Sequence, residues 1–77
     1  MVFEKCRDIV VEQMGIDKDS ITLDSRLVED IGADSLDTVE ILMNIENEFD
    51  IELNDEDAIE KLKTFKDVVE YVESLIK

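Results

Sequence analysis

The chain has 77 residues, a hydrophobic content of 44% and a formal net charge of −14, from 22 acidic and eight basic residues. This length predicts one small domain, residues 1–77, with a core near the lower limit for independent folding. Such a negative charge disfavours nucleic acid and anionic membranes, and it favours partners with basic surfaces. The single cysteine excludes an internal disulfide framework and is typical of a reducing compartment, so we expect a cytoplasmic protein.

The spacing of apolar residues along the chain indicates helices. There is no proline and there are two glycines, so the turn residues of β-hairpins are missing and an all-α fold is expected. The first helix is predicted from Val2 to Met14, where apolar residues recur every three or four positions and Gly15 ends the run. Cys6 lies on the apolar face and is interpreted as a core residue, since the chain has no histidine to activate it.

A long loop is predicted from Ile16 to Ile31, with a short helical turn around Arg26 to Asp30. Such a loop in a small domain is either functional or packed by its own apolar residues. We expect it to be mobile, together with the third helix. It is not a calcium loop, because Ile21 and Thr22 stand where a ligand and a glycine are needed. The apolar residues expected to pack this loop are Ile16, Ile21, Leu23, Leu27, Val28 and Ile31.

The second helix, from about Ser35 to Asp50, is apolar on two faces. The predicted core face holds Thr38, Ile41, Leu42, Ile45 and Phe49, and the roughly opposite face holds Leu36, Val39 and Met43 beside Glu40. The second face fits either a helix buried on both sides or a partner-docking surface. Docking is favoured because the stretch between Leu27 and Glu60 has acidic residues and no basic ones, which would attract a basic partner.

Two further helices complete the prediction. A short one is expected from about Asp55 to Lys61, capped by Asn54 or Asp55. The last runs from about Phe65 to Ile76, where Thr64 and Asp67 have the spacing of a capping box.

Ser35 stands at the start of the second helix, at or next to its N-cap, with Asp34 as the competing cap. Gly32 allows a tight turn before it. Taken alone, the serine fits an ordinary helix cap. The same position also suits a phosphate, because unpaired N–H groups and the positive end of the helix dipole lie there. No histidine and no glycine-rich phosphate loop occur, so we expect no catalytic residue, no metal site and no enzyme activity.

The nine residues Gly32-Ala33-Asp34-Ser35-Leu36-Asp37-Thr38-Val39-Glu40 closely resemble the prosthetic-group attachment motif of acyl carrier proteins. The resemblance extends over essentially the whole chain. It implies a small four-helix bundle with a long first loop and a short third helix. Many relatives have a proline at the start of the third helix, where this chain has Leu53-Asn54-Asp55.

The resemblance also implies a function. Ser35 would carry 4′-phosphopantetheine through a phosphodiester, transferred from coenzyme A by a phosphopantetheinyl transferase. The thiol of this arm would carry growing fatty acyl chains as thioesters and deliver them to enzymes of fatty acid synthesis, with the carrier acting as a monomer. The acyl chain would lie beside Leu42, Ile45 and Phe49. The residues that would meet basic partner surfaces are Asp34, Leu36, Asp37, Val39, Glu40, Met43 and Glu46.

Two alternatives remain open from the sequence. One is a carrier of another pathway, polyketide, peptidyl or D-alanyl, with the same attachment serine and a different cargo. The other is an unmodified acidic helical module that binds a partner or a cation.

Overall fold

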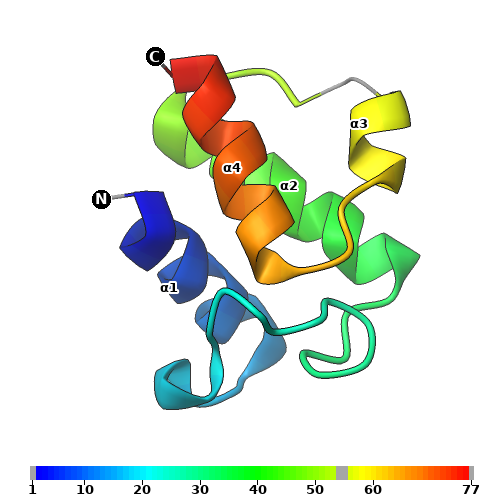
Figure 1. Cartoon of the computed structure of the whole chain (residues 1–77). Helices are drawn as coiled ribbons and strands as arrows, with labels where there is room; N and C mark the ends of the chain where they lie inside the picture. The colour runs from blue at the N-terminus through cyan, green and yellow to red at the C-terminus, as the bar shows by residue number, and fades with distance from the viewer. Residues whose placement is uncertain (1, 54–55, 77) are drawn as a thin grey trace.

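The computed structural model describes residues 2–53 and 56–76 and confirms the all-α expectation. The helices are α1 (Val2–Met14), the 3₁₀-helix η1 (Lys18–Ser20), α2 (Ser35–Phe49), α3 (Glu56–Glu60) and α4 (Phe65–Ile76). In Figure 1, α2 passes behind α4, α1 lies beside them, and the short α3 lies to one side. None of the described helices is long and apolar enough to span a bilayer.

The ends of α1 and α2 follow from local backbone geometry. Gly15 has a φ of +66° and donates its N–H to the carbonyl of Val11 at 2.8 Å, which ends α1 where the sequence predicts. Asp50 has a φ of 55° and caps α2, so this helix ends at Phe49, one residue before the predicted end. A left-handed residue cannot continue a right-handed helix.

The core lies between α1, α2 and α4. Cys6, Ile45, Phe65 and Val72 are fully buried in it, and Phe3 packs edge-on against Phe65 with ring centroids 5.3 Å apart. The three long helices therefore bury one face each, which is how so short a chain forms a core. In the part of the chain that the structure describes, the buried hydrophobic residues are Cys6, Val10, Ile21, Leu27, Ile31, Ala33, Ile41, Leu42, Ile45, Leu53, Phe65, Val68, Val69 and Val72.

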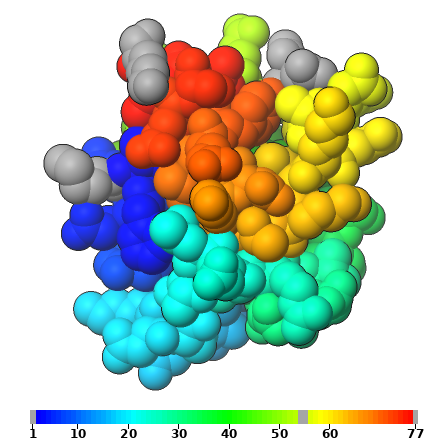
Figure 2. All heavy atoms as spheres, in the orientation of Figure 1, coloured from blue at the N-terminus to red at the C-terminus, as the bar shows by residue number. Residues whose placement is uncertain are grey.

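The long loop between α1 and α2 is tied to the start of α4. The N–H of Phe65 donates to the carbonyl of Ser25 at 2.8 Å, and that of Lys66 donates to Leu23 at 3.0 Å. Figure 2 shows this loop, in cyan and green, against the first residues of α4 and beside α1. The expectation that Leu23 and Val28 are buried is wrong, because their side chains are 43% and 65% exposed.

Within the loop, the predicted turn is present. The N–H of Asp30 donates to the carbonyl of Arg26 at 3.0 Å, and the Asp30 carboxylate accepts from the N–H of Arg26 at 2.8 Å. The Arg26 guanidinium and backbone hold the pKa of Asp30 below its usual value. The sequence reasoning did not foresee η1, whose cap Asp17 accepts a hydrogen bond from the N–H of Asp19.

The last two helices agree with the prediction where the structure describes them. Helix α3 lies within the expected range, and its proposed caps, Asn54 and Asp55, are outside the described residues. The N–H of Asp67 donates to Thr64 Oγ1 at 3.3 Å and the N–H of Thr64 donates to Asp67 Oδ2 at 3.0 Å, which confirms the capping box of α4.

Candidate functional site

Ser35 is the first residue of α2, and Asp34 is the cap. The turn before Ser35 is held by the backbone of Gly32 and by a hydrogen bond from Ala33 to the long loop. Gly32 has a φ of +83°, and the N–H of the buried Ala33 donates to the carbonyl of Leu27 at 2.9 Å. The side chain of Ser35 is exposed as a result. The sequence allowed either Asp34 or Ser35 as the N-cap of α2. In the structure Asp34 is the N-cap, and the side chain of Ser35 does not cap the helix.

A reciprocal capping box organises the first turn of α2. Asp34 Oδ1 accepts from the N–H of Asp37 at 2.9 Å, and Asp37 Oδ2 accepts from the N–H of Asp34 at 3.4 Å. The carbonyl of Asp34 accepts from both the N–H and the hydroxyl of Thr38, each at 2.9 Å. These contacts fix the backbone on both sides of Ser35 without using its hydroxyl.

The polar groups of this turn that form no hydrogen bond in the described chain are suited to binding a phosphate on Ser35. Among residues 2–53 and 56–76, the Ser35 hydroxyl has no hydrogen-bond partner, and no acceptor pairs with the backbone N–H groups of Ser35 and Leu36. Unpaired N–H groups at a helix N-terminus carry partial positive charge and bind phosphate oxygens. The hydroxyl and its anion-binding surroundings are thus present in one turn.

The second apolar face of α2 is exposed. Leu36, Val39 and Met43 are 64%, 49% and 55% exposed, and Glu40 is exposed beside them. This rules out, for the described residues, the interpretation of α2 as a helix buried on both sides. A row of exposed apolar side chains among acids is typical of a protein interaction surface.

Two of the acids assigned to this surface also have internal tasks. Asp37 is half-buried and belongs to the capping box. Glu46 is half-buried too, and its Oε2 accepts from the N–H of Leu53 at 3.0 Å, which ties the segment after α2 back to the helix. Asp34 and Glu40 are exposed, so they are the acids most open to a partner.

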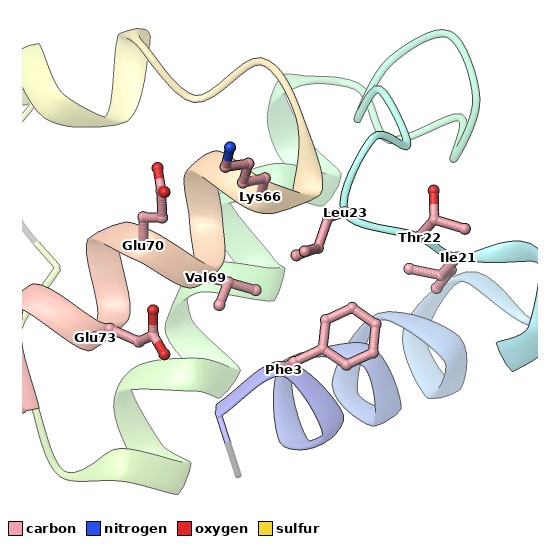
Figure 3. Close-up of a pocket in the computed structure, with 8 residues that line it drawn as sticks. All are labelled: Phe3, Ile21, Thr22, Leu23, Lys66, Val69, Glu70 and Glu73. Atoms are coloured by element: carbon pink, nitrogen blue, oxygen red, sulfur yellow. The ribbon is translucent and has the colours of Figure 1, made fainter.

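The opposite face of α2 lies in the core. Leu42 and Ile45 are 3% and 0% exposed, Phe49 is half-buried, and the ammonium of Lys5 lies 5.8 Å from the Phe49 ring centroid. The structure holds an open groove of about 550 Å³ elsewhere, between α1, the long loop and α4. Figure 3 shows Phe3, Leu23 and Val69 around this groove; Leu42, Ile45 and Phe49 do not line it.

Sequence reasoning missed one residue near this site. Gln13 of α1, which the periodicity places on the apolar face, donates from Nε2 to the backbone carbonyl of Asp37 at 3.0 Å. Its place on the apolar face marks Gln13 as an unusual polar residue, but nothing local identifies its partner, because the contact joins residues 24 positions apart.

The comparisons with known proteins agree with this geometry. Residues 4–72 match the family described as "Phosphopantetheine attachment site", which makes the chain a phosphopantetheine-binding domain. It is 53% identical over 76 residues to an acyl carrier protein of Campylobacter hominis, covering 99% of this chain and 95% of the relative. It is 53% identical over 72 residues to an acyl carrier protein of Akkermansia muciniphila, covering 94% and 89%. A third such protein, of Campylobacter concisus, is 50% identical over 76 residues, covering 99% and 97%.

The chain therefore belongs to the acyl carrier protein family. It is a non-catalytic carrier with a phosphopantetheine attachment site, as its motif and helix pattern predict.

Proposed function

We propose that Ser35 is the attachment residue and carries 4′-phosphopantetheine through a phosphodiester. The observation that carries this proposal is the exposed Ser35 hydroxyl at the first residue of α2, beside backbone N–H groups without an acceptor in the described chain. The matched family region includes this residue. When bound, the group supplies a thiol on a long arm, and the protein supplies the anion-binding turn and the surface recognised by partners.

We further propose that the arm carries fatty acyl chains as thioesters between enzymes of fatty acid synthesis. The names of the relatives support an acyl cargo. The partners, including a phosphopantetheinyl transferase, would use basic surfaces, because the exposed face of α2 combines Leu36, Val39 and Met43 with Glu40 and Asp34. The single buried cysteine supports a reducing compartment, and we propose the cytoplasm and a monomeric carrier.

The acyl chain is proposed to lie beside Leu42, Ile45 and Phe49. Leu42 and Ile45 are buried in the packed core. The acyl chain would therefore enter by separating the helices, because it has no existing cavity to fill beside these residues in the described chain. A protein with an acylated arm should then melt at a higher temperature as the chain lengthens. A melting temperature independent of chain length would place the acyl group in solvent.

The attachment residue is tested by intact mass after incubation with coenzyme A and a phosphopantetheinyl transferase. Wild type should gain the mass of one phosphopantetheine arm and Ser35→Ala should gain none. Ser74→Ala is the matched control, since Ser74 is also an exposed serine within a helix and should leave modification intact.

Two outcomes would contradict the proposal. A mass gain in Ser35→Ala would move the attachment to another residue. No gain in folded, initially unmodified wild type, with a transferase active on a known carrier, would favour an unmodified interaction module.

A further inference from the structure

Gln13 connects α1 to two positions of α2 that lie about two helical turns apart. Its Nε2 donates to the backbone carbonyl of Asp37 at 3.0 Å, and its Oε1 accepts from Nδ2 of Asn44 at 3.1 Å. The side chain is half-buried near the end of α1. It lies in the polar hollow between the two helices that Ile9, Glu40 and Asn44 also line.

The geometry of these two bonds fixes one helix relative to the other. Asp37 and Asn44 are seven residues apart, which is about two turns of an α-helix, so they lie on the same face of α2. A side chain that bonds to both sets the rotation and the height of α1 against α2. An amide suits this position because it is uncharged and supplies both a donor and an acceptor.

The bond from Gln13 to the carbonyl of Asp37 reaches the first turn of α2, which also contains Ser35. The other side-chain hydrogen bonds of residues 34–38 join members of the same turn, so for the described chain Gln13 supplies the long-range side-chain bond. A helix end that is held only by contacts within its own turn can fray, because all of those contacts are lost when the turn opens. The Gln13 bond opposes this opening from a separate element.

We infer that Gln13 is a positioning residue, which holds the first turn of α2 and the serine on it in the geometry that the modifying transferase binds. The inference rests on the proposed attachment at Ser35. If the bound geometry is populated for less of the time, the apparent affinity for the partner falls by the same fraction, while the chemical step within the complex is unchanged. Loss of Gln13 should therefore raise KM and leave kcat unaltered.

The test uses Gln13→Met, which keeps the length, the packing and the helix propensity of the side chain but removes both hydrogen bonds. Asn44→Ala removes only the second bond. Val72→Ala is the control for general destabilisation, because Val72 is fully buried in α4 and has no part in the site. Transferase kinetics and amide hydrogen exchange of the unmodified proteins are measured for all three and for wild type.

In Gln13→Met, exchange at the amides of Asp37 and Thr38 should rise relative to the amides of α4. KM for the carrier should also rise, by up to about fivefold, which is the limit set by the loss of one net hydrogen bond. Asn44→Ala should show a smaller rise in KM. Val72→Ala should raise exchange throughout the molecule without this local excess.

The inference is overturned if exchange at Asp37 and Thr38 in Gln13→Met changes only in step with α4. It is equally overturned if kcat falls while KM stays constant, or if Val72→Ala raises KM as much. If wild type is not modified at all, the proposed attachment fails, and the exchange comparison still decides whether Gln13 holds the turn.

Discussion

At the scale of the residue, Asp34 combines two tasks that can be separated. Its carboxylate caps α2 by accepting from the N–H of Asp37, and its exposed charge contributes to the acidic surface beside Ser35. That charge lies close to the phosphate that we propose on Ser35, and it would be electrostatically unfavourable for that phosphate. We therefore assign the charge to recognition by a basic partner.

Two substitutions separate capping from recognition. Asp34→Asn retains a capping oxygen, so its unfolding free energy should stay within about 0.5 kcal/mol of wild type. Its kcat/KM with the transferase should fall a few-fold at low salt, and the deficit should shrink as salt screens the charge. Asp34→Ala loses the cap as well and should lose about 1 kcal/mol of stability. Transferase kinetics of Asp34→Asn equal to those of wild type at low salt would remove the recognition role.

At the scale of the element, the start of α4 depends on the ionised form of Asp67. The N–H groups of Lys63 and Thr64 donate to its Oδ2 at 2.9 and 3.0 Å, and these bonds lower the pKa of Asp67 from its ordinary value of 3.8. A carboxyl whose pKa is lower in the folded state stabilises the fold above the unfolded pKa. This contribution is lost as the pH falls through the folded pKa.

Asp67→Asn should therefore be less stable than wild type at pH 7, by about 1 kcal/mol or less because the group is only half-buried. The difference should vanish as the pH falls below the folded pKa of Asp67, where wild type is protonated as well. Urea unfolding at a series of pH values measures it. Glu70→Gln is the control, since Glu70 is exposed on the same helix and has no hydrogen-bond partner among the described residues. A difference between wild type and Asp67→Asn that persists unchanged at low pH would contradict the linkage.

The helices were predictable because their signals are local. Apolar spacing and the stop at Gly15 gave α1, and the capping pair Thr64 and Asp67 gave the start of α4. The choice of Asp34 over Ser35 as cap needed the structure, because both residue types cap helices well. The exposure of Leu23 and Val28 was not predictable either, since it depends on how the loop meets α4.

The candidate site divides in the same way. Ser35 and the exposed row on α2 follow from a motif and from helical periodicity, both of which can be read within a dozen residues. The contact from Gln13 to Asp37 joins two helices, and the spacing within either helix does not identify the partner. The position of the groove beside Phe3 and Val69 likewise depends on packing between α1, the loop and α4.

At the scale of the whole molecule, repulsion between like charges dominates the electrostatics. Lys5 with Glu48 at 3.5 Å and Arg26 with Asp30 at 3.0 Å are exposed ion pairs, and exposed pairs contribute little to stability. The net charge of −14 is spread over a chain with a radius of gyration of only 11.1 Å. Screening should therefore relieve more repulsion than it costs in lost attraction.

Added salt or millimolar magnesium should accordingly raise the melting temperature, by about 4–8 °C for each kcal/mol of repulsion relieved. Calorimetry at low salt, with magnesium chloride, and with sodium chloride at matched ionic strength measures the effect and separates screening from ion binding. A melting temperature unchanged under all three conditions would show that repulsion does not limit the stability of this fold.

The burial of Cys6 bears on the chemical stability of a thioester carried by the arm. Thioesters are destroyed by attack of a neighbouring thiolate, so a protein that carries them is endangered by a reactive cysteine of its own. Cys6 is the single cysteine of the chain, it is fully buried, and burial, with the charge of Glu73, raises its pKa to about 11. The fold thus keeps its own sulfur protonated and out of reach, and an acyl group on the arm is protected from transfer to the protein that bears it.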